Sequence, residues 1–172
     1  MLHHSHAPAG YQCPFCELLN DLPFSEGNLC APTDMIYQTR HAAAIMACDG
    51  FGKYGGHVMI IPTAHLESLY DLDDEVGAVI MREPRRIALA MKLAWAPEGT
   101  STRQHNEPAG NQHVWHYHQH VFARYSDDML YRQLRHRVPV ADRAEKAEQV
   151  RAAVFSERHP FALTEAELRR VS

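Results

Sequence analysis

Three histidines alternate with other residues in the second half of the chain: His116, His118 and His120. Successive side chains of a β-strand point to opposite faces, so a strand here would place the three imidazoles on one face, roughly 6.5–7 Å apart. Imidazole is suited to nucleophilic attack, proton transfer and metal binding near neutral pH. A histidine-rich tract can also chelate metal unspecifically or remain from a purification tag. This run is internal and continues as the apolar segment 121–123, which favours a buried strand that presents chemistry on one face.

A turn-rich polar segment, 106–112, leads into the histidines. Its Asn106 and Gln112 are either ordinary loop residues or hydrogen-bond donors to a ligand, and the position of Gln112 four residues before His116 favours the second interpretation. A neutral imidazole can attack phosphorus, which divides one difficult step into two easier ones. Amide and imidazolium donors would stabilise the charge that develops on the phosphoryl oxygens. Residues of these types would therefore suit phosphoryl or nucleotidyl transfer, the chemistry that the resemblance described next implies.

The whole arrangement resembles the active-site segment of the histidine triad family, in which an Asn, a Gly-containing loop and a Gln precede a His-x-His-x-His strand. The resemblance implies a nucleotide hydrolase that cleaves the α-phosphate bond of nucleoside phosphoramidates or dinucleoside polyphosphates. In that reaction His118 would become covalently nucleotidylated, and His120 would bind or protonate oxygens near the leaving group. Asn106 and Gln112 would donate hydrogen bonds to phosphate. Three alternatives stay open: a phosphorylase or nucleotidyl transferase, a non-catalytic nucleotide-binding regulator, and a small zinc-stabilised interaction module.

A second stretch similar to the family surrounds Asp49, which stands eight residues before His57 in a Gly-rich segment. In the family an Asp at this place accepts hydrogen bonds from ribose hydroxyls, and a carboxylate suits a vicinal diol. An Asp before a Gly can also be a plain turn former. Phe15 and Leu18 are candidates for apolar contact with the nucleotide base, although either could belong to the core. The base preference stays open.

Cys13 and Cys16 form a C-x-x-C pair, which can be half of a zinc site, a redox pair or a coincidence. The other two cysteines are isolated, so a four-ligand zinc site would need two histidines. The resemblance to the zinc-bearing, bacterial-type branch of the family suggests His65 and His116. Zinc held by these four ligands would be a structural ion in a closed site, tying the N-terminal segment to the histidine strand.

The elements that must position these residues are a mixture of helices and strands, and we expect an α+β, HIT-like fold. Its core would be an antiparallel sheet of about five strands packed on one long helix from Leu66 to about Trp95, which Pro84 should kink or divide. A short helix is expected over 13–20, and strands over Met35–Gln38, Ala42–Ala47, His57–Pro62, Thr100–His105 and His113–Arg124. Further helices are expected over Met129–His136 and Ala141–Glu157, with a last short one opened by the capping box at Thr164–Glu167.

These elements suggest a disordered segment 1–12, a HIT-like catalytic domain 13–125 and a helical C-terminal extension 126–172. The arginines between Arg132 and Arg143 are either a phosphate-binding surface or a solvated face, and the acidic residues from Asp142 onward favour the solvated face.

Length and charge limit the partners of the chain. The length of 172 residues predicts one domain, and the net charge of −4 gives no basic surface of the kind that binds nucleic acid. No apolar run approaches the roughly 20 residues of a membrane helix, and residues 1–6 lack the features of a signal peptide. We therefore expect a cytoplasmic enzyme with reduced thiols that acts on a small-molecule nucleotide. The exposed sheet edges and the resemblance further predict a homodimer.

Overall fold

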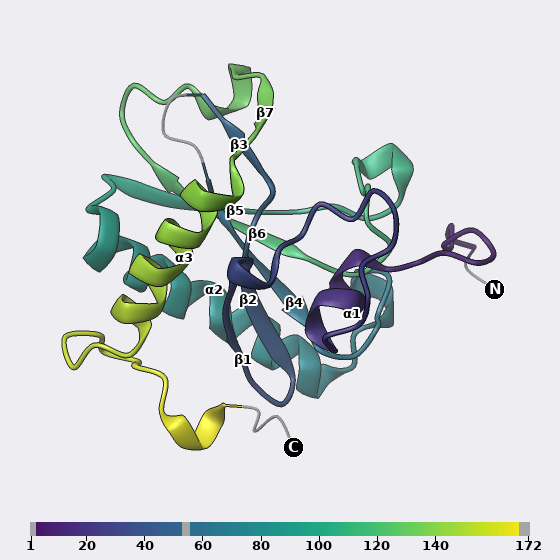
Figure 1. Ribbon diagram of the computed structural model, residues 1–172, viewed down its shortest axis with the longest axis horizontal. Coiled ribbons are helices and arrows are strands. Elements are labelled where there is room, and N and C mark those ends of the chain that lie inside the picture. The colour runs from purple at the N-terminus through teal and green to yellow at the C-terminus, as the bar shows by residue number, and fades with distance from the viewer. Residues whose placement is uncertain (1–2, 53–55, 169–172) are drawn as a thin grey trace.

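The computed structural model describes residues 3–52 and 56–168, and its centre is a five-stranded sheet with the strand order β1-β2-β4-β6-β5 (Figure 1). Every neighbouring pair in this sheet is antiparallel. The α+β fold expected from the sequence is thereby confirmed. The strands are β1 (Met35–Gln38), β2 (Ala42–Met46), β4 (Val58–Pro62), β5 (Gly99–Gln104) and β6 (Gln119–Arg124).

Each face of the sheet carries its own apolar cluster, because alternate side chains of a strand point in opposite directions. Ala42, Ala44 and Met46 of β2 pack with the helices α2 (Asp74–Trp95) and α3 (Val140–Val154). Ala43 and Ile45 point to the other face, where they pack with the short helix α1 (Pro14–Leu19). The second face also carries the functional site described below.

The long helix α2 starts later than the sequence pattern suggested. Its N-cap is Asp73, whose carboxylate accepts a hydrogen bond from the Val76 N–H, and residues before it form only a 3₁₀ turn at Leu69–Asp71. Of the kink or division expected at Pro84, the division is wrong, because the helix runs through that residue without interruption. Ile80, Ile87 and other residues of its buried face pack on the sheet, and this packing offsets the hydrogen bond that a proline removes.

The segment after Ser126 differs most from the sequence-based expectation. The prediction of a helix over Met129–His136 is wrong, because the chain forms a 3₁₀ turn at Leu130–Arg132 and then the strand β7 (Arg135–Arg137). This strand pairs antiparallel with β3 (Asp49–Phe51) to make a separate two-stranded sheet, at the top of Figure 1. Short helices are marginal without tertiary support, whereas β3 supplies backbone partners that the local sequence does not reveal.

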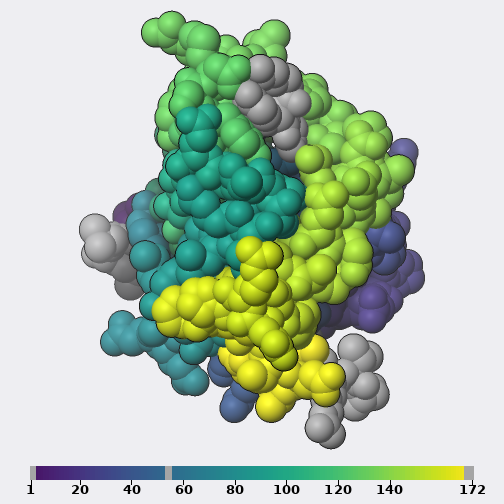
Figure 2. All heavy atoms as spheres, turned by 90° about the vertical axis from the view of Figure 1, so that its left-hand side faces the viewer, coloured from purple at the N-terminus to yellow at the C-terminus, as the bar shows by residue number. Residues whose placement is uncertain are grey.

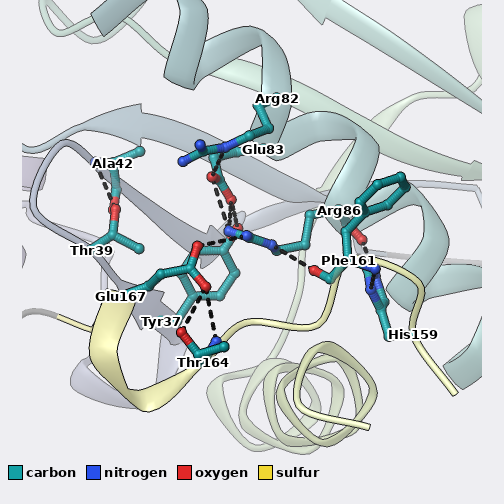
Figure 3. Close-up of polar contacts among 10 residues, drawn as sticks. All are labelled: Tyr37, Thr39, Ala42, Arg82, Glu83, Arg86, His159, Phe161, Thr164 and Glu167. Carbon is teal, nitrogen blue, oxygen red and sulfur yellow. Dashed lines mark hydrogen bonds and ion pairs between the residues drawn. The ribbon is translucent and has the colours of Figure 1, made fainter. Parts of the chain in front are cut away.

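The rest of the C-terminal part packs on the central domain. Helix α3 confirms the expected helix over 141–157, although it ends at Val154, and the chain then crosses α2 (Figure 2). The carboxylate of the fully buried Glu83 accepts hydrogen bonds from Tyr37 (2.6 Å) and Arg86 (2.7 Å), and Arg86 also donates to Glu167 (2.9 Å), as Figure 3 shows. The expected capping box is present at Thr164 and opens the 3₁₀ turn Glu165–Glu167.

The N-terminal segment was expected to be disordered. Its described residues, 3–12, contain no helix or strand, but the backbone N–H groups of Ser5 and Ala7 donate to the carboxylates of Glu107 and Glu67. Residues 1–2 lie outside the described part. Among residues 3–52 and 56–168, no helix is long and apolar enough to cross a membrane.

Candidate active site and metal centre

A cavity of about 580 Å³ opens on the α1 face of the sheet. Its wall combines an apolar part with a row of imidazoles and arginines, so one chamber offers both a surface for a flat ring and groups for an anion. The lining residues that matter for the chemistry are Phe15, Leu29, Asp49, His57, Met59, Arg103, His105, His113, His118, His120, Arg135 and Arg137.

The three alternating histidines do not share one strand. Strand β6 begins at Gln119, so only His120 lies in it, and the expectation of a strand over His113–Arg124 holds for its second half alone. The backbone before Gln119 leaves the sheet, and the Tyr117 N–H donates to the Leu66 carbonyl instead. His118 and His120 nevertheless line the same cavity, with ring centroids 5.0 Å apart.

His118 is held as a neutral imidazole with a defined tautomer. Its side chain is buried, and Nδ1 lies 2.7 Å from the His116 carbonyl oxygen. A carbonyl only accepts, so Nδ1 carries the proton and Nε2 keeps the lone pair. Burial lowers the pKa of His118 to about 4, which keeps the ring unprotonated at neutral pH. The geometry therefore presents a nitrogen nucleophile.

His57, a residue that the sequence did not single out for the site, fixes His120 in the tautomer opposite to that of His118. Nε2 of His57 lies 2.8 Å from Nδ1 of His120, and the His57 ring stacks on Phe122 at 4.3 Å. Nδ1 of His57 is buried without a partner in the described part of the chain. At this buried Nδ1 atom an unpaired lone pair costs less free energy than an unpaired N–H group. His57 therefore carries its proton on Nε2 and donates a hydrogen bond to Nδ1 of His120. His120 then carries its own proton on Nε2, where it can be given to a leaving group.

The buried His57 makes the stability of the fold depend on pH. Burial lowers the pKa of His57 to about 3, against about 6.5 in an unfolded chain. The unfolded state therefore binds the extra proton first, and the associated stability is present above pH 6.5 and lost as the pH falls toward 3. We expect His57→Gln to flatten the pH dependence of the free energy of unfolding by about 1 kcal/mol per pH unit between about pH 6 and pH 4. Urea unfolding of both proteins across this window measures the slopes, and parallel curves would contradict the prediction.

Arg103 is a second site residue that the sequence did not single out. It pairs with His120 across β5 and β6, and both side chains line the cavity. Its guanidinium lies 5.3 Å from the ring centroid of Phe122 and 5.0 Å from that of Tyr131, so aromatic faces hold it in place. The strand register brings this cation to the triad, and a local pattern in the sequence does not reveal such a register.

The structure places Asn106 and Gln112 outside the cavity lining. The amide of Gln112 accepts from the Glu107 N–H at 2.7 Å and donates to the Val114 carbonyl at 3.1 Å. Asn106 accepts from the Leu69 N–H at 2.8 Å. Both amides thus hold the loop that precedes the triad, while other polar residues of this region, His105, Asn111 and His113, line the cavity. A direct contact of either amide with phosphate stays a prediction.

Of the three residues expected to contact the nucleotide, two line the cavity and one does not. Phe15 lines the cavity, and its ring meets that of His118 edge-on at 5.5 Å. Leu18 of α1 is buried in the core and does not reach the lining. Asp49 lines the cavity from β3, where its carboxylate forms ion pairs with Arg137 (3.0 Å) and Arg135 (3.5 Å). These two arginines belong to the cavity wall, whereas the sequence favoured a solvated face for them.

The four expected metal ligands come together into one cluster. The sulfur and Nδ1 atoms of Cys13, Cys16, His65 and His116 all lie within 4.8 Å of one another. The Cys13–His116 and Cys16–His65 contacts measure 3.3 and 3.2 Å, close to the about 3.6 Å that separates S and N ligands of one tetrahedral zinc ion. Nε2 of His116 bonds to the Pro62 carbonyl at 2.9 Å, which fixes its proton there and leaves the Nδ1 lone pair for a metal. The donor set fits zinc.

Comparison with known proteins agrees with this geometry. The model of the HIT domain family matches residues 28–127. A protein named hit from Bacillus subtilis is 29% identical over 114 residues, covering 66% of this chain and 71% of the relative. The adenosine 5′-monophosphoramidase of Saccharomyces cerevisiae is 29% identical over 109 residues, covering 63% and 60%. The crystal structure of a zinc-bound histidine triad family protein from Mycobacterium smegmatis superposes with a TM-score of 0.66 at 29% identity, covering 82% and 91%.

Proposed function

Because the chain belongs to the histidine triad (HIT) family, we propose that it is a nucleotide-binding hydrolase that works through a nucleotidyl-His118 intermediate. The bond cleaved is the α-phosphate bond of a nucleoside phosphoramidate or a dinucleoside polyphosphate. One observation carries the proposal: His118 and His120 line one cavity with complementary tautomers, the first offering a lone pair and the second a proton.

These tautomers suggest the order of events. The Nε2 lone pair of His118 attacks the α-phosphorus, an N–P bond forms, and the bond from phosphorus to the leaving amine or phosphate breaks. The leaving group takes the Nε2 proton of His120. Water then attacks the phosphorus of nucleotidyl-His118 and gives a proton back to His120. The N–P bond breaks, and a nucleoside monophosphate and free His118 are released.

Charge on the phosphoryl oxygens needs donors close to His118 and His120. Arg103 can supply such donors, since it pairs with His120 across the two strands and its guanidinium is a fork of N–H groups. Asn106 and Gln112 support this part of the site by holding the preceding loop. We propose that Asp49 accepts hydrogen bonds from the ribose and that Phe15, Leu29 and Met59 form the apolar wall against the base.

The test of the function is turnover across a panel of adenosine and guanosine phosphoramidates and dinucleoside polyphosphates, with and without added phosphate. The relative from yeast is named a monophosphoramidase, so the phosphoramidates come first in the panel. Release of nucleoside monophosphate in water supports a hydrolase. A product that appears only with phosphate identifies a phosphorylase, and tight binding without turnover of any substrate identifies a nucleotide-binding regulator.

We further propose that the Cys₂His₂ cluster binds one structural zinc ion. Four protein ligands close the coordination sphere, so no position remains for a substrate. The ligand His116 also supplies the carbonyl that orients His118, which connects the metal to the nucleophile through one residue. We propose the cytoplasm as the location, where the four cysteines would be kept reduced.

The free edge of the sheet predicts a homodimer. Within the described residues β5 pairs only with β6, so its outer edge has no strand partner. Helix α3 packs mainly against α2, β1 and β2, and these two strands lie toward the opposite edge of the sheet. Met81 of α2 is 67% exposed. Two copies that pair through β5 and α2 would cover both features. Light scattering at micromolar concentration should give a mass of about 39 kDa, twice 19.6 kDa, and a mass near that of one chain would contradict the dimer.

A further inference from the structure

Two arginines meet the carboxylate that we assign to the ribose. In the pairing of β3 with β7, Asp49 stands opposite Arg137, and Phe51 stands opposite Arg135. Residues two apart on a strand share a face, so both guanidiniums reach the same carboxylate, at 3.0 and 3.5 Å. All three side chains line the cavity that holds His118. The C-terminal segment therefore contributes directly to the wall of the site.

The arrangement carries more positive charge than Asp49 needs. One carboxylate faces two guanidiniums, which leaves a net charge of about +1 on a chain whose total is −4. Each guanidinium has five N–H donors in a planar fork, and an ion pair with one carboxylate uses only part of them. The side chains of Arg135 and Arg137 are 56% and 47% exposed, so most of these donors face the cavity and solvent.

Ion pairs at such exposure contribute little to folding stability. A single arginine would suffice to neutralise Asp49 and to fasten β7 to β3. A ligand that brings negative charge of its own next to the ribose would use the second cation. The guanidinium group of arginine can form two parallel hydrogen bonds to the oxygens of one phosphate. The free-energy cost of breaking an exposed ion pair with Asp49 to form them is small.

We propose that the substrates include nucleotides whose ribose carries a further phosphate ester, on the 2′ or the 3′ oxygen, and that Arg135 and Arg137 bind this phosphate. Asp49 then accepts a hydrogen bond from the hydroxyl that remains free. The inference rests on the proposed function, because it takes the Asp49 side of the cavity as the ribose side. It names the class of nucleotide and leaves the chemistry at His118 unchanged.

Calorimetric titration of the full chain with three nucleotides tests the proposal: AMP, adenosine 2′,5′-bisphosphate and adenosine 3′,5′-bisphosphate. We expect one bisphosphate to bind at least tenfold more tightly than AMP, and the comparison of the two isomers identifies the esterified oxygen. Arg135→Ala/Arg137→Ala should remove this preference, so that the ratio of bisphosphate affinity to AMP affinity falls to about one. The preference should also shrink as salt is raised, since it depends on exposed charges.

Arg132→Ala provides the matched control, because Arg132 is an exposed arginine of the same segment and does not line the cavity. It should keep the preference for the bisphosphate. Equal binding of all three nucleotides to the unmodified chain would overturn the inference and leave the proposed function standing. An equal loss of AMP and bisphosphate binding in the double variant would overturn it too, because the arginines would then only hold β7 in place. Failure of all three nucleotides to bind would overturn the proposed function itself.

Discussion

Replacement of His118 by asparagine is expected to lower turnover at least a thousandfold while nucleotide binding survives. Without the Nε2 lone pair no N–P bond can form, and direct attack of water must replace the two easier steps. A factor of a thousand corresponds to about 4 kcal/mol in the activation barrier. The side-chain amide N–H of asparagine lies near the place of Nδ1, so the hydrogen bond to the His116 carbonyl can persist and the cavity keeps its shape.

The matched control is His41→Asn, the same chemical change in the turn between β1 and β2, away from the cavity. Its turnover should equal that of the unmodified chain. Rapid mixing followed by mass spectrometry should detect a nucleotide adduct on the unmodified chain and none on His118→Asn. If His118→Asn keeps a tenth of the activity on the best substrate, His118 is not the nucleophile.

The parts of the fold that follow local patterns could be predicted from the sequence. The hairpin of β1 and β2 and the buried strand β4 are continuous or alternating apolar runs, and α3 shows helical spacing. The Cys₂His₂ cluster could also be predicted, because a lone C-x-x-C needs two more ligands and the family resemblance supplies them. These signals lie within a few residues of one another or in the motifs that carry the family resemblance.

Features that depend on distant partners could not be predicted. Residues 135–137 form a strand only because β3, more than eighty residues earlier, offers its edge, and this pairing brings two arginines to Asp49. Arg103 reaches His120 through the register of β5 on β6. The amides of Asn106 and Gln112 match the family pattern in type and spacing, yet their orientation toward the loop interior follows from partners at Glu107 and Leu69. Composition and spacing contain no information on such pairings.

Removal of the zinc ligands should affect both the metal content and the stability of the chain. Purified protein is expected to contain about one zinc ion per chain by elemental analysis, since four soft and borderline ligands converge. Cys13→Ser should lose the metal, because its sulfur lies in the cluster 3.3 Å from the His116 nitrogen. Binding at a thousandfold excess over the dissociation constant stabilises a fold by about 4 kcal/mol. For a domain of this size that amounts to a fall of about 10 °C in the melting temperature.

The matched control for this loss is Cys30→Ser, which makes the same atomic change at a cysteine outside the cluster and should keep both the metal and the melting temperature.

The loss of zinc should also lower turnover, because His116 connects the cluster to His118. His116 is at once a ligand of the cluster and the residue whose carbonyl fixes the tautomer of His118. Loss of zinc removes one of the bonds that position the His116 side chain, beside its contact with the Pro62 carbonyl. The kcat of Cys13→Ser should therefore fall even below the temperature at which the variant unfolds. Metal-free protein with undiminished stability and turnover would show that the cluster does not hold a structural ion.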